Sequence, residues 1–265
     1  MMADIPDSHP RKKSLLSRQK IVDGTKKGLL ADSAMIAHGR GEAFDYLLGE
    51  KTSNSAKTAI KESAARLIEA DNPVISVNGN TVVLAGKSLI RVAAVLNCPI
   101  EVNIYYRTDE RIKKLHSLLE KEKKKLSQED APKNWKGDWG VAVMSVNILG
   151  RESDGRIEGL EGPRSICSSE GIEKADVVLV PLEDGDRCEA LVNLGKQVLV
   201  VDLNPLSRTA KMATVTIVDE ISRAAEILLD DVINNSQKAK NWNNKKNLVE
   251  ALKIIANNAT TPEIL

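Results

Sequence analysis

Short apolar runs alternate with longer amphipathic stretches along most of the chain. Apolar runs of five or six residues lie at 73–77, 99–104, 141–146, 175–180, 197–201 and 214–218. Their nearly continuous apolar character is typical of strands that are covered on both faces. Helical spacing follows the first run up to about residue 96 and recurs over 109–126. The alternation predicts an α/β fold, a Rossmann-like parallel sheet wrapped by helices.

The segment before the first predicted strand is helical in pattern. Apolar positions at helical spacing predict helices over 8–30, 41–48 and 54–71, and thus a helical N-terminal extension. Residues 127–140 are polar and contain Pro, Gly and two Trp, which predicts a surface loop. The Asn/Lys-rich stretch 234–247 predicts a connector, with a closing helix over 248–256.

These patterns predict one α/β domain over residues 1–265. It consists of a helical N-terminal part (8–72), a Rossmann-like core (73–233) and a loosely attached C-terminal tail (234–265).

Composition narrows the class of protein. Of 265 residues, 38 are Lys or Arg and 37 are Asp or Glu, so the net charge is +1 and a nucleic-acid coat is disfavoured. Aromatic residues are only 3% of the chain, too few for a stacking platform for single strands. The three Cys lie far apart, which excludes a CxxC zinc site and suits a reducing compartment. No apolar run approaches ~18 residues and no signal core is present, so we expect a cytoplasmic protein without a membrane partner.

The richest candidate chemistry follows the predicted strand 175–180. Three acids, a glycine and an arginine stand there within five residues: Glu183, Asp184, Gly185, Asp186 and Arg187. Ligands of open α/β sheets bind beyond the carboxyl ends of the strands, where acids can hold hydrated Mg²⁺ or ribose hydroxyls. A helix start there can offer N–H groups to a phosphate. The competing interpretation is a polar turn that caps the next helix.

Two further strand ends carry polar sets. Asp202, Leu203 and Asn204 follow the strand 197–201, and Ser207 and Arg208 open the next element, where a hydroxyl and a guanidinium can bind phosphate. The alternative is a turn in which Ser207 caps a helix and Arg208 is solvated.

The first predicted strand ends in a third polar set. Asn78 and Asn80 follow it and are candidates to orient a second substrate.

The sequence His-Gly-Arg-Gly at 38–41 is a fourth candidate. His38 and Arg40 flank a glycine, and we expect Arg40 near a helix start, where anions bind. The alternative is a core histidine and a turn arginine. Nearby, residues 9–27 hold seven cations and one acid, which usually means a solvated basic face.

Several enzyme classes lack their motif in this chain. It contains no GxxxxGK[ST], GxGxxG, GxSxG or HExxH, which disfavours Walker-type NTPases, dinucleotide-binding dehydrogenases, esterases of the nucleophile-elbow type and zincins. The residues alone thus indicate a polyanion site suited to a nucleotide and a second phosphorylated substrate, without naming a reaction.

Taken together, these blocks resemble one family. The stretches 8–18, 36–52, 74–80, 180–187 and 202–210, which include HGRGEAFDYLLGEKT and DLNPLSRTA, are similar to the archaeal phosphopantothenate synthetase (4-phosphopantoate–β-alanine ligase) family. The likeness spans about residues 5 to 230. It implies a Rossmann-like homodimer of archaeal coenzyme A biosynthesis. The implied reaction condenses 4-phosphopantoate with β-alanine while ATP is cleaved to AMP and diphosphate, with an acyl-adenylate intermediate and Mg²⁺ bound with ATP.

The resemblance also implies site residues. Arg18, Arg40, the stretch from Glu183 to Arg187 and the stretch from Asp202 to Asn204 would hold ATP. Placement makes Arg40, Arg208 and Asn204 the candidates for catalysis. His38, Asn78, Asn80, Ser207 and Arg208 are candidates for substrate binding, and Asp184, Asp186 or Asp202 for Mg²⁺.

The chain departs from the family pattern in three places. The loop 127–140 looks long, Cys188 stands where a hydroxyl is expected, and the tail after 234 carries no family signal. Three other functions stay open: a nucleotide sensor of the same fold, an ATP-dependent ligase for another carboxylate, and a nucleic-acid-binding protein that uses the basic segment 9–27.

Overall fold

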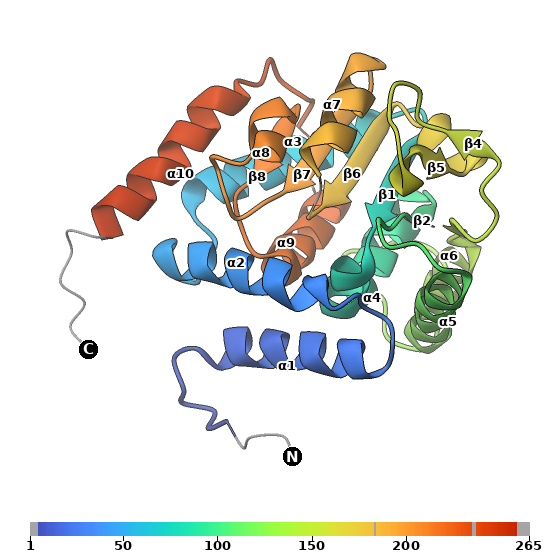
Figure 1. Ribbon diagram of the computed structural model, residues 1–265, viewed down its shortest axis with the longest axis horizontal. Coiled ribbons are helices and arrows are strands. Elements are labelled where there is room, and N and C mark those ends of the chain that lie inside the picture. Colours follow the sequence, from blue (N-terminus) through green and yellow to red (C-terminus); the bar gives the residue numbers. More distant parts are fainter. Residues whose placement is uncertain (1–4, 183, 235–236, 259–265) are drawn as a thin grey trace.

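A six-stranded parallel sheet lies at the centre of the computed structural model, which describes residues 5–182, 184–234 and 237–258 (Figure 1). The strands are β1 (Pro73–Val77), β2 (Ile100–Val102), β3 (Ile148–Leu149), β6 (Val177–Pro181), β7 (Gln197–Val201) and β8 (Val215–Ile217). Their spatial order is β3-β2-β1-β6-β7-β8, and every pairing is parallel. The predicted α/β class is confirmed. The order reverses between β1 and β6, and ligands of doubly wound sheets bind at such a point.

Helices cover both faces of the sheet, which explains why the strands are apolar at consecutive positions. Along β6, Val177 and Leu179 join one core cluster, whereas Val178 and Val180 join the other. The first layer holds α3 (Asn54–Glu69), α4 (Gly79–Leu96), α5 (Asp109–Leu126) and α9 (Ile221–Asn234). The second holds α7 (Gly185–Asn193) and α8 (Arg208–Met212).

The helix α4 is long and apolar enough to pass a length-and-composition test for a membrane span, contrary to the expectation that no stretch approaches that limit. It is the one such helix among the described residues, and 61% of it is buried. It packs against α9 and α5, as the core helix of a folded domain does.

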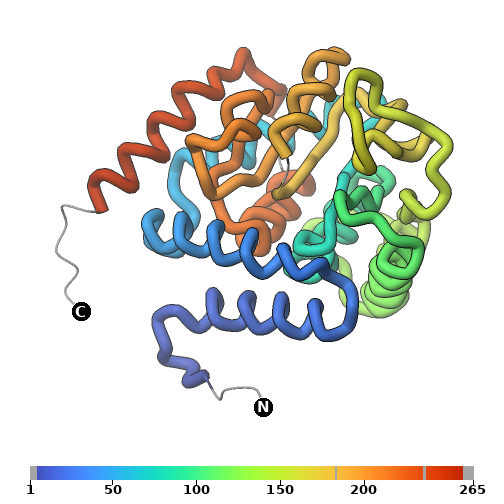
Figure 2. Tube along the Cα trace, in the orientation of Figure 1, coloured from blue at the N-terminus to red at the C-terminus, as the bar shows by residue number. Residues whose placement is uncertain are grey.

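Two N-terminal helices lie outside the sheet layers. α1 (Lys12–Lys26) and α2 (Ser33–Leu47) run in opposite directions, and α2 crosses the carboxyl ends of the strands (Figures 1 and 2). The helix α2 begins well before the predicted start at 41, so Arg40 lies in mid-helix and the expectation of a helix start there is wrong.

Within the described part of the tail, residues 244–258 pack against the rest of the chain. α10 (Asn244–Asn258) buries Leu248 and Ala251, and the amide of Asn244 donates to the carbonyl of Ala210 over 2.8 Å.

The run 141–146 is the one predicted strand that forms a helix, α6 (Trp139–Ser145). The carboxylate of Asp138 accepts a hydrogen bond from the backbone N–H of Val141 and caps the helix. Trp139 and Val143 are buried while Val141 is exposed, which is the periodicity of a helix. The strand comes two residues later, as β3. A small ribbon of β4 (Gly155–Arg156) and β5 (Ile166–Cys167) was not predicted.

Candidate functional site

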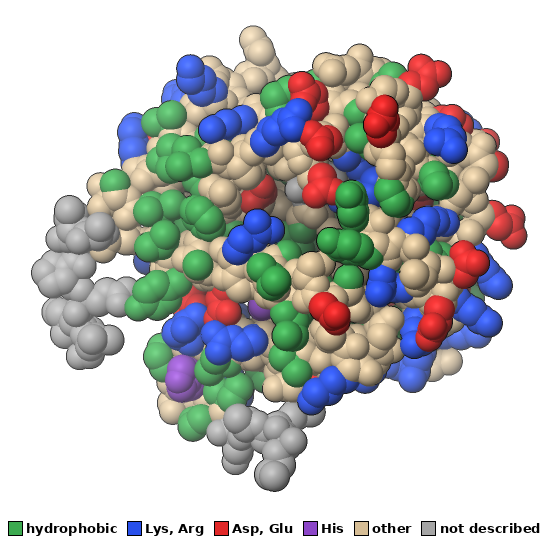
Figure 3. Space-filling model, viewed as in Figure 1, with side chains coloured by type: hydrophobic (Ala, Val, Ile, Leu, Met, Phe, Trp, Pro, Cys, Tyr) green, Lys and Arg blue, Asp and Glu red, His purple; other side chains and the backbone are tan. Residues whose placement is uncertain are grey.

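A cleft of about 670 Å³ lies at the carboxyl ends of the central strands, beneath α1 and α2. Figure 3 shows a hollow near the middle of this face, with charged side chains around it. Nine of the residues singled out from the sequence line the cleft: His38, Arg40, Asn78, Asn80, Asp184, Asp202, Leu203, Asn204 and Ser207. The structure thus brings together residues from three separate strand ends and from the HGRG block.

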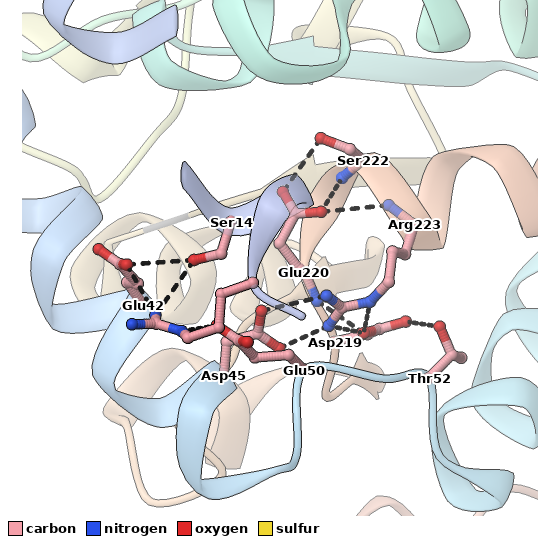
Figure 4. Close-up of polar contacts among 10 residues, drawn as sticks. Ser14, Glu42, Asp45, Glu50, Thr52, Asp219, Glu220, Ser222 and Arg223 are labelled. Atoms are coloured by element: carbon pink, nitrogen blue, oxygen red, sulfur yellow. Dashed lines mark hydrogen bonds and ion pairs between the residues drawn. The ribbon is translucent and has the colours of Figure 1, made fainter. Parts of the chain in front are cut away.

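An ion-paired arginine holds α2 against the sheet layer. Arg223, at the start of α9, donates to Asp45 of α2 over 2.5 and 3.1 Å and to Asp219 over 2.6 Å (Figure 4). The hydroxyl of Thr52 donates to the second oxygen of Asp219. Burial acts to lower the pKa of Arg223, but the hydrogen bond to Asp45 and the charge of Asp219 raise it overall. Both aspartates are buried, so this guanidinium fixes α2 where it borders the cleft.

A second cluster holds α1 against α2. Glu42 accepts from Arg11 over 3.0 Å and from Arg18 over 2.6 Å, and Arg11 also donates to Glu50. Burial raises the pKa of Glu42, but the hydrogen bonds from Arg18 and Ser14 outweigh this and lower it. Arg18 does not line the cleft, so the structure gives it a role in joining the two helices.

His38 lies one helical turn before Glu42. Its Nε2 atom is buried and has no hydrogen-bond partner among the described residues. Burial lowers the pKa of His38 below its usual value, and nearby Arg18 lowers it as well, while Glu42 and Glu220 oppose the shift. The lowered pKa favours the neutral imidazole, and His38 is the one histidine of three that lines the cleft.

Asp202 is at once a turn residue and a wall of the cleft. Its carboxylate accepts hydrogen bonds from the backbone N–H of Asn204 and the hydroxyl of Ser207. Ser207 in turn caps α8, as the alternative interpretation of this set expected. Burial raises the pKa of Asp202, against those hydrogen bonds and the positive charge of Arg40. Arg40 is exposed and has no hydrogen-bond or ion-pair partner within the described part of the chain, so its cation remains available to a ligand.

The two asparagines brace the cleft. Asn78 caps α4 through Thr81, and its amide donates to the carbonyl of Leu182 over 2.8 Å, across the point where the strand order reverses. Leu182 has a φ of 58°, a strained value for a residue with a side chain, and starts the turn after β6. The amide of Asn80 donates to the carbonyl of Ala34 in α2.

The acidic turn after β6 does not act as one unit. Asp184 lines the cleft, whereas Asp186 and Arg208 form an ion pair on a separate surface hollow. Arg187 is buried and donates to the hydroxyl of Ser76. A Cβ on Gly185 would lie 2.8 Å from the side chain of Arg208, so this glycine serves packing. Glu183 lies outside the described residues.

Sequence reasoning missed several residues of the cleft, because they lie outside the strand-end turns that it examined. They are Lys13, Lys20, Tyr105, Tyr106, Arg111, Arg164, Glu220 and Arg223. The segment from Asn103 to Tyr106 directly follows β2. The position of ligand sites beyond the carboxyl ends of strands could therefore have predicted that this segment lines the cleft.

Neither cysteine chemistry nor a built metal centre is found in the described residues. All three cysteines are buried, and burial raises the pKa of Cys98 and of Cys167 to about 12, so these thiols are inert as nucleophiles. Across the described ranges, no group of three His, Cys, Asp or Glu side chains is placed to hold a metal ion.

Known proteins match this chain over most of its length. The family model described as phosphopantothenate/pantothenate synthetase matches residues 55–138 and 139–258. The match passes residue 234, so the expectation that the tail carries no family signal is wrong.

Three archaeal relatives carry the name 4-phosphopantoate–β-alanine ligase. The protein of Thermococcus onnurineus is 48% identical over 84% of this chain and 78% of its own length. The protein of Methanospirillum hungatei is 46% identical over 83% of this chain and 81% of its own length. The protein of Methanosarcina mazei is 42% identical over 100% of this chain and 94% of its own length.

Proposed function

Because this chain belongs to the phosphopantothenate/pantothenate synthetase family, we propose that it is a 4-phosphopantoate–β-alanine ligase that uses ATP. The observation that carries the proposal is the cleft at the strand ends, which joins three of the family-like blocks: HGRG, VNGN and DLNPLS. Its mixture of cations and apolar walls suits two phosphorylated substrates. The ligase works in coenzyme A biosynthesis, and we infer that it acts in the cytoplasm.

The proposed chemistry has two steps. A carboxylate oxygen of 4-phosphopantoate attacks the α-phosphorus of ATP, the bond to the β-phosphate breaks and diphosphate leaves. The amine of β-alanine then attacks the acyl carbon of the adenylate, and the acyl C–O bond breaks with release of AMP. Much of the rate enhancement comes from orientation and charge neutralisation in the cleft.

ATP is assigned to the β6–β7 end of the cleft. Arg40 and Asp202 support this assignment, because the exposed guanidinium acts to lower the pKa of a partly buried acid that follows a parallel strand. Asn204 and Ser207 lie in the same turn. Mg²⁺ that arrives with ATP would bind through Asp202, because the other strand-end acid that reaches the cleft, Asp184, is ion-paired with Arg164. When bound, it neutralises phosphate charge.

His38 is proposed to accept a proton from the ammonium group of β-alanine. A neutral imidazole is required for this, and burial lowers the pKa of His38 and so favours its neutral form. The freed amine lone pair then attacks the acyl carbon, and the second proton leaves to solvent when the amide forms.

A homodimer is proposed through the outer face of α2. Four large apolar side chains on this helix are exposed: Met35, Ile36, Tyr46 and Leu47. Residues eleven apart return to within about 20° on a helix of 3.6 residues per turn, so Met35 aligns with Tyr46 and Ile36 aligns with Leu47, in two adjacent rows about 100° apart. His38, Gly41 and Asp45 lie on the opposite side, toward the cleft. Sedimentation velocity is expected to give a dimer that Ile36→Lys dissociates, and a monomeric wild type would contradict the proposal.

A diphosphate-release assay tests the function. With ATP, Mg²⁺ and 4-phosphopantoate, we expect release that turns over only when β-alanine is added. Unphosphorylated pantoate is the control acid. Binding of ATP without release would favour the sensor, and release with another acid would favour a different ligase. Salt-dependent binding of DNA or RNA would instead favour a nucleic-acid-binding protein.

Replacing Arg40 with Ala is expected to raise the KM for ATP and to lower turnover. One charged hydrogen-bonding partner contributes ~1.5–3 kcal/mol, which is roughly 10- to 100-fold in kcat/KM. Steady-state kinetics with varied ATP check this, and Arg156→Ala, at an exposed position outside the cleft, is the matched control. Unchanged ATP kinetics would remove Arg40 from the nucleotide site.

A further inference from the structure

The β2 end of the cleft carries two arginines that the proposed nucleotide site does not use. Arg164 and Arg111 both line the cleft, and neither belongs to the family-like blocks. Arg164 precedes β5 in the excursion 150–174, and Arg111 lies in the first turn of α5. This end of the cleft therefore has its own positive charge.

Arg164 is a guanidinium built into the cleft wall. Arg164 is 7% exposed. Its guanidinium donates to the carboxylate of Asp184 over 2.9 Å and to the side-chain oxygen of Asn103 over 3.3 Å. Asn103 is itself held by the carbonyl of Ile166. A charge this deep is costly to desolvate unless its orientation is fixed by partners. Asn103 and Asp184 fix the plane of this fork.

Arg111 is attached to the same short segment. Its Nη1 donates to the carbonyl of Tyr106, while its Nε is buried and has no hydrogen-bond partner in the described part of the chain. Asn103 and Tyr106 are three residues apart, so their Cα atoms are at most ~11 Å from each other. Both guanidinium groups therefore serve one end of the cleft.

The reaction requires a second anion site. Both phosphorylated substrates must lie in the cleft at once, and a guanidinium fork matches the geometry of phosphate oxygens. An acid that is paired only with Arg40 would compete with ATP for the same cation.

We propose that Arg164 and Arg111 bind the phosphate group of the phosphorylated hydroxy acid and thereby select it over the unphosphorylated acid. This inference rests on the proposed function and names the residues that recognise its second substrate. Arg164 is the positioned donor, and Arg111, which also lines the cleft, contributes the second guanidinium. ATP keeps the β6–β7 end.

The test compares Arg164→Gln, Arg111→Gln and the control Arg156→Gln by calorimetric titration and by diphosphate release. Each cleft variant is expected to weaken binding of 4-phosphopantoate by about 10- to 100-fold, as loss of a charged hydrogen bond predicts. ATP affinity and the weak binding of unphosphorylated pantoate should stay at the wild-type level. Arg156→Gln should bind all three ligands as the wild type does.

The outcomes separate this inference from the function on which it rests. A wild type that releases no diphosphate contradicts the proposed function. An active wild type whose variants bind 4-phosphopantoate normally, or lose ATP and both acids equally, overturns the phosphate site. Thermal unfolding identifies a misfolded Arg164→Gln, in which case Arg111→Gln and the charge-keeping Arg164→Lys decide. Arg164→Lys should retain more selectivity for the phosphorylated acid than Arg164→Gln.

Discussion

Replacing Arg223 with Gln is expected to lower the free energy of unfolding by about 3–5 kcal/mol. The guanidinium lies between Asp45 and Asp219, two buried carboxylates that would be left facing each other without a cation. Glutamine cannot neutralise either of them. Urea unfolding followed by circular dichroism measures the change, as a lower midpoint at an unchanged slope.

An exposed ion pair supplies the control for this change. Lys253 and Glu250 pair on the surface of α10, so Lys253→Gln is expected to cost less than about 1 kcal/mol. An Arg223→Gln loss of similar size would contradict the view that this cluster clamps α2. Asp45→Asn is also expected to destabilise the protein, because Arg223 would lose one of its two carboxylate partners.

The sheet could be predicted from the sequence because its two faces are equally buried. Runs such as 175–180 and 197–201 are apolar at all positions but one, which is typical of strands covered on both faces. The run 141–146 is also nearly continuously apolar, but it forms α6. Asp138 caps this helix, and the side chain of Trp139 is buried in the core. Periodicity within six residues cannot separate these outcomes.

The site could be predicted only in part, because strand-end position does not determine where a side chain points. Asp184, Asp186 and Arg187 are near neighbours in sequence, yet one faces the cleft, one pairs outside it and one is buried. The place of Arg164 in the cleft could not be predicted, because the neighbouring strands β4 and β5 have only two residues each and show no hydrophobic periodicity. The start of α2 at Ser33 was hidden by the glycines of HGRG, which favour turns but lie here in mid-helix.

Replacing His38 with Gln is expected to lower the rate of phosphopantothenate formation by about 10²- to 10⁴-fold, the usual contribution of a general base. Glutamine keeps polarity and approximate size but cannot accept the ammonium proton of β-alanine. Adenylate formation involves no such proton, so exchange of labelled diphosphate into ATP with 4-phosphopantoate should persist. His9→Gln, at an exposed position outside the cleft, is the matched control.

The pH dependence gives this prediction its sign. Burial lowers the pKa of His38 below its ordinary value of 6.5, in the presence of Glu42, Glu220 and Arg18. Turnover that needs neutral His38 is therefore favoured above the lowered pKa and is lost as the pH falls through it. The wild-type profile at saturating substrates should show this acid limb, and the His38→Gln profile should lack it. A variant with the same acid limb, or one that loses diphosphate exchange as severely as product formation, would show that His38 positions substrates and does not take the proton.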